Sequence, residues 1–155
     1  MLRSAFIVLW LALVLSPVMA RGAGPDQSWK RVALSAQAFP NQSKTIYIDV
    51  PSASNGVSNL MMRAFIGQAQ WMRQLTDAMA RGSEFPTYVV VGSESDGVAY
   101  SALAKAVSSF KGKQLPNLHL ALIGNSPQGE QLRSAVEALG AEYRVLGSEK
   151  MESDD

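Results

Sequence analysis

Cysteine is absent from this 155-residue chain, and histidine occurs once, as His119. Without cysteine the chain has no disulfide framework, no thiolate nucleophile, no iron–sulfur ligand set and no zinc ribbon. One histidine is too few for a two- or three-histidine metal site, and no segment has the D-x-[DN]-x-[DN]-G spacing of a calcium loop. We therefore expect neither a metal site nor a cofactor.

An excess of charge of one sign is also missing, because 14 Lys and Arg side chains face 13 Asp and Glu side chains. The first 20 residues carry one charge, Arg3, so the remaining 135 residues hold 13 basic and 13 acidic side chains. Proteins that bind nucleic acid need clustered positive charge to neutralise phosphates. We expect no nucleic-acid partner.

The long hydrophobic run of the chain stands at the N-terminus. Arg3 precedes an apolar run over residues 5–15, Ser16 and Pro17 interrupt it, and Val18, Met19 and Ala20 follow. This layout is typical of a secretory signal peptide. The alternative is an uncleaved membrane anchor, but a spanning helix needs about 20 apolar residues. We expect residues 1–20 to be removed, with the cleavage point within residues 20–23, and no stable membrane span afterwards.

A signal peptide implies export, with the periplasm as the expected compartment and the extracellular space as the alternative. The mature chain is expected to begin with a flexible lead over residues 21–30, to form a single domain over residues 31–146, and to end in an acidic disordered tail over residues 147–155.

Strand and helix patterns alternate along this domain. Strands are expected over residues 32–38 as a weak edge strand, and over residues 45–50, 89–91, 118–123 and 143–146. Helices are expected over residues 55–81 with Gly82 as C-terminal cap, 99–110 with Gly112 beyond its end, and 126–139 ending at Gly140. In the last helix, Ser126 is the expected N-cap, Pro127 the first helical residue, and Ala135 one of the buried positions.

Such alternation requires right-handed βαβ crossovers and a mainly parallel sheet. The fold expected is α/β: a small three-layer sandwich with a sheet of four to five strands and about three helices, flavodoxin-like or half-Rossmann. Ligands in such sheets bind beyond the carboxyl ends of the strands. Three polar loops follow strand ends there, and they supply these candidate ligand-binding residues: Asp49, Ser52, Ser54, Asn55, Ser93, Ser95, Asp96, Asn125 and Ser126. The competing interpretation is that strand-to-helix turns need such residues for capping.

No catalytic residue can be assigned. Residues 92–97 and 124–129 have the glycine spacing of a P-loop, but residues 98–99 and 130–131 lack the Lys and the Ser or Thr that contact phosphate and Mg²⁺. Neither loop has the G-x-G-x-x-G spacing of a dinucleotide site. His119 stands near the start of its strand, at the edge opposite the loops, where a packed or edge histidine is expected rather than a general base.

The helix expected over residues 55–81 has an apolar arc wider than contact with a sheet requires. Met62, Ile66 and Trp71 lie on its flanks, and Met and Trp side chains are common in protein contacts. Packing against the first strand or the N-terminal segment is the alternative explanation.

These patterns favour an exported, non-catalytic module that is an accessory or assembly subunit of an envelope or secretion complex, with a protein partner in the cell envelope. The alternative is a small-ligand binding domain or degenerate enzyme that uses the polar loops, with an unknown ligand.

Overall fold

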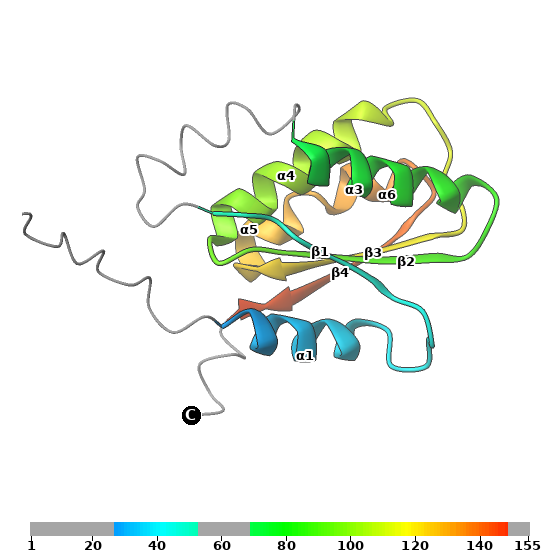
Figure 1. Ribbon diagram of the computed structural model, residues 1–155. Coiled ribbons are helices and arrows are strands. Elements are labelled where there is room, and N and C mark those ends of the chain that lie inside the picture. The colour runs from blue at the N-terminus through cyan, green and yellow to red at the C-terminus, as the bar shows by residue number, and fades with distance from the viewer. Residues whose placement is uncertain (1–26, 53–68, 149–155) are drawn as a thin grey trace, which may run out of the picture.

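Four strands with continuous or alternating apolar residues form the centre of the molecule. The computed structural model describes residues 27–52 and 69–148 (Figure 1). Its elements in chain order are α1 (Ser28–Ala38), β1 (Ile46–Asp49), α3 (Gln70–Ala80), the 3-10 turn η2 (Arg81–Ser83), β2 (Thr87–Gly92), α4 (Asp96–Ser109), β3 (Leu118–Gly124), α5 (Ser126–Glu130), α6 (Arg133–Glu137) and β4 (Glu142–Gly147). The expected signal peptide over residues 1–20 lies outside the described residues.

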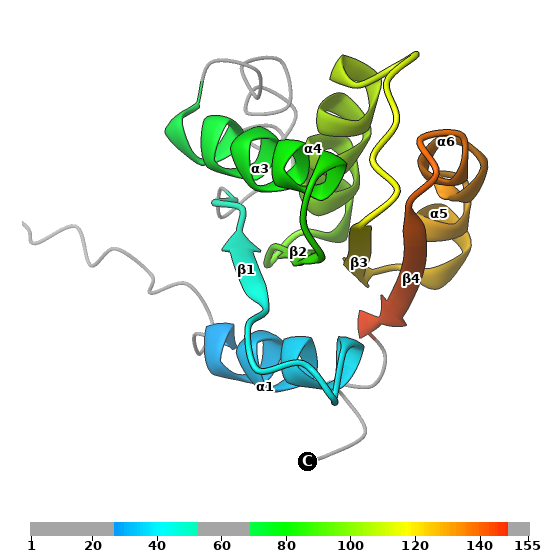
Figure 2. The same ribbon diagram turned by 90° about the vertical axis from the view of Figure 1, so that its right-hand side faces the viewer.

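All four strands are parallel and lie side by side in the order β1-β2-β3-β4. Helices α3, α4, α5 and α6 cover one face of the sheet, and α1 lies on the other face (Figures 1 and 2). The α/β class and the parallel sheet predicted from the sequence are therefore confirmed. Four of the expected strands are present, since residues 45–50, 89–91, 118–123 and 143–146 overlap β1 to β4.

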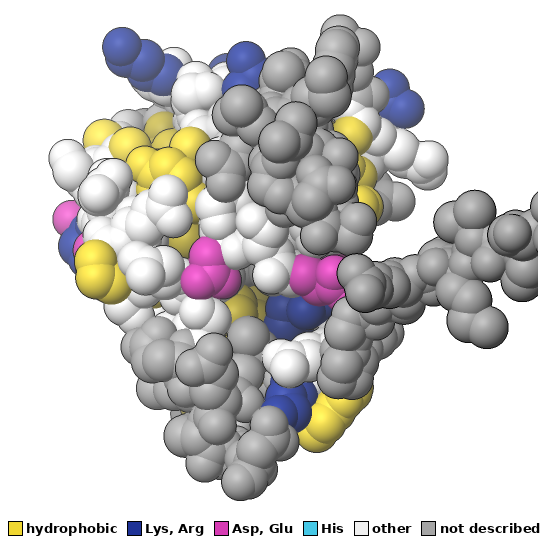
Figure 3. Space-filling model, turned by 90° about the vertical axis from the view of Figure 1, so that its left-hand side faces the viewer, with side chains coloured by type: hydrophobic (Ala, Val, Ile, Leu, Met, Phe, Trp, Pro, Cys, Tyr) yellow, Lys and Arg dark blue, Asp and Glu magenta, His cyan; other side chains and the backbone are white. Residues whose placement is uncertain are grey.

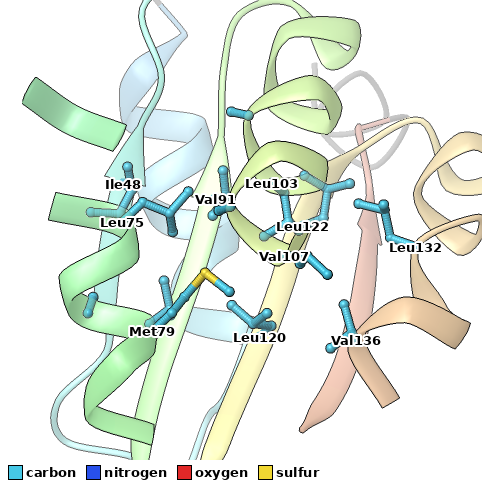
Figure 4. Close-up of a cluster of buried hydrophobic side chains, with 14 of the residues drawn as sticks. Ile48, Leu75, Met79, Val91, Leu103, Val107, Leu120, Leu122, Leu132 and Val136 are labelled. Carbon is cyan, nitrogen blue, oxygen red and sulfur yellow. The ribbon is translucent and has the colours of Figure 1, made fainter. Parts of the chain in front are cut away.

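The two faces of the sheet carry two separate hydrophobic cores, because successive side chains of a strand point to opposite sides. The main core lies under α3, α4 and α6 and includes Leu75, Leu103, Leu120, Leu122 and Val136 (Figure 4). The second core is smaller and joins α1 to the sheet through these residues: Leu34, Ala38, Phe39, Val90, Ala121 and Ile123. Since β2 and β3 are covered on both faces, their sequences are continuous apolar runs.

The prediction of an edge strand over residues 32–38 is wrong, because this segment belongs to helix α1. The helix begins at Ser28, inside the segment expected to be a flexible lead. Its buried residues recur at three- and four-residue steps as a helix requires, namely Arg31, Leu34, Ser35 and Ala38. α1 therefore presents one side to the sheet, and the opposite side of the same helix faces away from it.

Gly112 and Gly140 end helices as expected, whereas Gly82 has a different role. Gly112 and Gly140 have φ angles of +82° and +74°, the left-handed conformation that ends a helix. Gly82, expected to be such a cap, lies in η2 without a positive φ. A Cβ atom at Gly82 would lie 2.5 Å from Cβ of Leu118, so glycine is required there by the close approach of η2 to β3.

The last helix also differs from the expectation. Its N-cap is Asn125, whose Oδ1 accepts a hydrogen bond from the backbone N–H of Gln128 at 3.0 Å, so the assignment of Ser126 as N-cap is wrong. Ser126 is the first helical residue instead. The expected helix is divided into α5 and α6, and Ala135 is exposed rather than buried. Within residues 27–52 and 69–148, no helix combines the length and the apolar character needed to cross a bilayer.

Candidate functional site

The carboxyl ends of the parallel strands meet at one edge of the sheet. Asp49 of β1 pairs with Gly92 of β2, and Gly124 of β3 pairs with Gly147 of β4. Figure 3 faces this edge and shows two acidic patches separated by neutral polar side chains, with basic side chains next to one of them. The strand ends, loops and helix starts at this edge hold these sequence-predicted residues: Asp49, Ser52, Ser93, Ser95, Asp96, Asn125 and Ser126. Ser54 and Asn55 lie outside the described residues.

Hydrogen bonds within the loops occupy several of these side chains. The Oγ atom of Ser93, a side chain that is only 3% exposed, accepts from the backbone N–H of Ser95 at 3.3 Å. Oδ2 of Asp96 accepts from the hydroxyl of Ser148 at 2.8 Å, and Asn125 caps α5. The Ser93 and Asn125 contacts close a turn and a helix start, which matches the capping interpretation, whereas the Asp96 contact joins the start of α4 to the residue that follows β4. In the described part of the chain, no three His, Asp or Glu residues form a group that could hold a metal ion.

Asp49 is the charge partner of a buried arginine. The side chain of Arg31 is 3% exposed, and its Nε lies 3.3 Å from Oδ1 of Asp49 and 3.3 Å from the hydroxyl oxygen of Tyr47. The Tyr47 hydroxyl donates to the same carboxylate oxygen at 3.0 Å. Burial, together with the negative charge of Asp49, raises the pKa of Tyr47 to about 12. Because a buried charge needs a partner, Asp49 holds α1 against β1.

The opposite, amino-terminal edge of the sheet holds a cluster that sequence reasoning did not assemble. The ring of His119 stacks on Tyr88 with centroids 4.4 Å apart and an angle of 14°. Its Nδ1 donates to Oε2 of Glu142 at 2.6 Å. The other oxygen of Glu142 accepts from Nε and Nη2 of Arg144, at 2.8 and 2.6 Å. Arg144 and, to a smaller extent, His119 hold the pKa of Glu142 below its usual value. His119 thus lies at the edge expected from the sequence.

The register of the sheet brings the residues of this cluster together. Tyr88 pairs with His119 across β2 and β3, and His119 pairs with Glu142 across β3 and β4. Side chains that are directly opposite on neighbouring strands contact each other. The cluster could be identified from the pairing of residues across the strands, but the sequence alone does not determine that pairing.

Helix α1 presents apolar side chains to solvent. Trp29 and Val32 are 65% and 51% exposed, and Ala33 and Ala36 are also exposed. Their spacing places all four on the side of the helix opposite its buried residues. We call these four residues the outer stripe. A helix that is apolar on two opposite sides is expected to be buried between two layers, yet the sheet covers only one side of α1.

The residues expected to form a partner contact from sequence lie elsewhere. Met62 and Ile66 are outside the described residues. Trp71 belongs to α3, where its half-buried ring packs against the main core. At Trp71 the structure therefore shows packing within the molecule.

Comparisons of this chain with models of known protein families, with curated proteins and with solved structures found no match.

Proposed function

We propose that this chain is an exported, non-catalytic α/β module, an accessory or assembly subunit of an envelope or secretion complex, and that the outer stripe of α1 contacts its protein partner. The apolar run of residues 5–15 and the small residues before Arg21 support export to the periplasm. The described strand order contains no reversal, so we further propose a half-Rossmann rather than a flavodoxin-like arrangement.

The exposed outer stripe is the observation that carries this proposal. Trp29 provides a large apolar surface of the kind that supplies much of the free energy of association in protein interfaces. Ala33 and Ala36 have small side chains, which allow a partner to approach the helix backbone closely. The stripe itself contains no charged residue, and depletion of charge is typical of the centre of an interface.

The polar loops at the carboxyl edge support a non-catalytic role. Ser93, Asp96 and Asn125 each bond to a nearby backbone or side-chain group within the edge. Acid–base or nucleophilic catalysis needs a base within hydrogen-bond reach of a nucleophile. The chain has a single imidazole, His119, and it lies at the opposite edge of the sheet.

The contact is tested by capture of the tagged protein from envelope extracts of its own cells. We compare the wild-type chain with Val32→Asp, which places a charge in the outer stripe, and with Gln37→Asp, a matched control on an exposed polar position of the same helix. We expect one partner to be recovered with the wild type and Gln37→Asp, and recovery to fall about tenfold or more with Val32→Asp. Equal recovery with both variants, or the absence of any partner, would overturn the proposal.

Export is tested separately by the mass of the protein purified from cells. We expect an N-terminus between residues 21 and 24, at a point consistent with signal cleavage. A chain that retains residues 1–20 would contradict export by a cleaved signal.

A further inference from the structure

An open pocket of about 280 Å³ lies at the amino-terminal edge of the sheet, where the chain leaves α1 and where β2, β3 and β4 begin. Figure 2 views the molecule from this edge. The loop after α1 contributes Phe39, Asn41 and Gln42. The strands contribute these lining residues: Tyr88, His119, Glu142 and Arg144. The volume is close to the lower limit for small-molecule sites, about 300 Å³. A single small ring is the size of ligand that it suits.

The charged groups of the pocket neutralise one another. The carboxylate of Glu142 lies between the guanidinium of Arg144 and the imidazole of His119. All three nitrogens of the Arg144 guanidinium are bonded, because Nη1 also donates to the carbonyl oxygen of Ala38 at 2.8 Å. The Nε–Nη2 side of the guanidinium is therefore occupied by Glu142 and is not available to a second carboxylate or to a phosphate. This arrangement favours an uncharged ligand.

Neutral polar groups remain available at the pocket. Because Nδ1 of His119 donates to Glu142, Nε2 is the ring nitrogen that remains to bond a ligand. Within the described part of the chain, Nε2 has no hydrogen-bond partner, and neither does the hydroxyl of Tyr88. The amides of Asn41 and Gln42 add donors and acceptors at the rim, and both residues are exposed. These groups match ligands whose hydroxyls both donate and accept.

Aromatic rings supply the apolar part of the pocket. Phe39 meets Tyr88 edge to face, with centroids 5.2 Å apart at 62°, and Tyr88 stacks on His119. The stack leaves no space between these two rings for a third planar group. A saturated ring that carries both C–H groups and hydroxyls can pack against the aromatic edges and bond to the neutral polar groups. We propose that this pocket binds one ring of a neutral saccharide.

The test uses the single histidine of the chain, whose imidazole proton signals in an NMR spectrum can be assigned without ambiguity. The mature protein is titrated at constant pH with methyl β-glucoside and with N-acetylglucosamine, and in parallel with inorganic phosphate and succinate. We expect a saturable shift of the His119 signals with at least one sugar and none with the two anions. The absence of saturation with both sugars, or saturation with an anion alone, would overturn the proposal.

Variants connect the signal to the pocket. Asn41→Ala and Gln42→Ala change exposed side chains, so the fold is expected to be retained, and each is expected to weaken sugar affinity about fivefold. Tyr88→Phe keeps the aromatic stack and removes only the hydroxyl, with a similar expected loss. Lys105→Ala, an exposed position on α4, is the matched control and should not change the affinity. Unchanged affinity in all three pocket variants would place the sugar elsewhere and would overturn the assignment.

Discussion

Two substitutions on helix α1, two positions apart, test its orientation on the sheet. Leu34 is 5% exposed and belongs to the second core, whereas Val32 is 51% exposed and belongs to the outer stripe. We expect Leu34→Ala to lower the free energy of unfolding substantially and Val32→Asp to leave it almost unchanged.

The magnitude for Leu34 follows from its surroundings. Buried Leu→Ala substitutions cost about 2.7–5.0 kcal/mol, depending on how far the neighbours fill the cavity. The neighbours of Leu34 include the small side chains of Ala38 and Ala121, and Ala121 is fixed within the central strand β3. These groups can fill little of the space, but the second core is small and close to the surface, so we expect a loss of about 3 kcal/mol. A change at an exposed position such as Val32 is expected to stay within about 0.5 kcal/mol.

Urea unfolding of the mature protein measures both values. With an m-value of about 2 kcal/mol/M, Leu34→Ala should lower the midpoint by about 1.5 M at unchanged m. A domain of this size has about 5–15 kcal/mol of stability, so the variant should remain folded in buffer. A loss below about 1 kcal/mol for Leu34→Ala, together with a loss above about 2 kcal/mol for Val32→Asp, would refute the orientation of α1.

Three further predictions concern the approach of Gly82 to Leu118, the Asn125 cap of α5 and the Glu142 carboxylate. Gly82→Ala should destabilise the protein by about 1–3 kcal/mol in urea unfolding, because the added Cβ would lie 2.5 Å from Cβ of Leu118; no change would contradict that contact. Asn125→Ala should cost about 1 kcal/mol through the lost cap of α5, and Asn125→Ser, another capping residue, should recover most of it. The pKa of Glu142 is lowered in the folded state, so its stabilisation is present above an unfolded value of about 4.3 and is lost as pH falls through the folded value. Between pH 7 and pH 3, the free energy of unfolding should therefore fall less for Glu142→Gln than for the wild type. The difference between the two losses should be under about 1 kcal/mol, because the carboxylate is partly exposed. Identical losses would contradict the assignment.

The strands and their parallel arrangement could be predicted because their physical causes are local. The apolar residues 89–91 and 118–123 are continuous since both faces of these strands are covered, and this pattern is visible without the structure. Glycines at the ends of α4 and α6 have positive φ angles, and here too the residue type indicates the conformation.

Helix α1 could not be predicted because two polar residues interrupt its buried side, while apolar residues occupy its exposed side. Its buried side includes Arg31, which is neutralised by Asp49, and Ser35, whose hydroxyl donates to the carbonyl of Val32 at 2.6 Å. Its exposed side carries Trp29 and Val32. A search for an apolar stripe that faces the core therefore finds no clear helix in this segment.

The candidate residues at the carboxyl edge were predictable as neighbours, because parallel strands must end on one side. Their hydrogen bonds were not, since the contact of Asp96 with Ser148 joins residues 52 positions apart. The cluster of His119, Glu142 and Arg144 depends on the pairing of β3 with β4, and residue types alone do not determine that register.

The most direct test of the central claim is site-specific photo-crosslinking in intact cells. A photoreactive phenylalanine derivative replaces Val32 in the outer stripe, or Lys105 on the exposed side of α4 as a control. The proposed function predicts a protein adduct of defined mass from position 32 and none from position 105. An adduct from position 105 with none from position 32 would contradict the assignment of α1 as the partner contact.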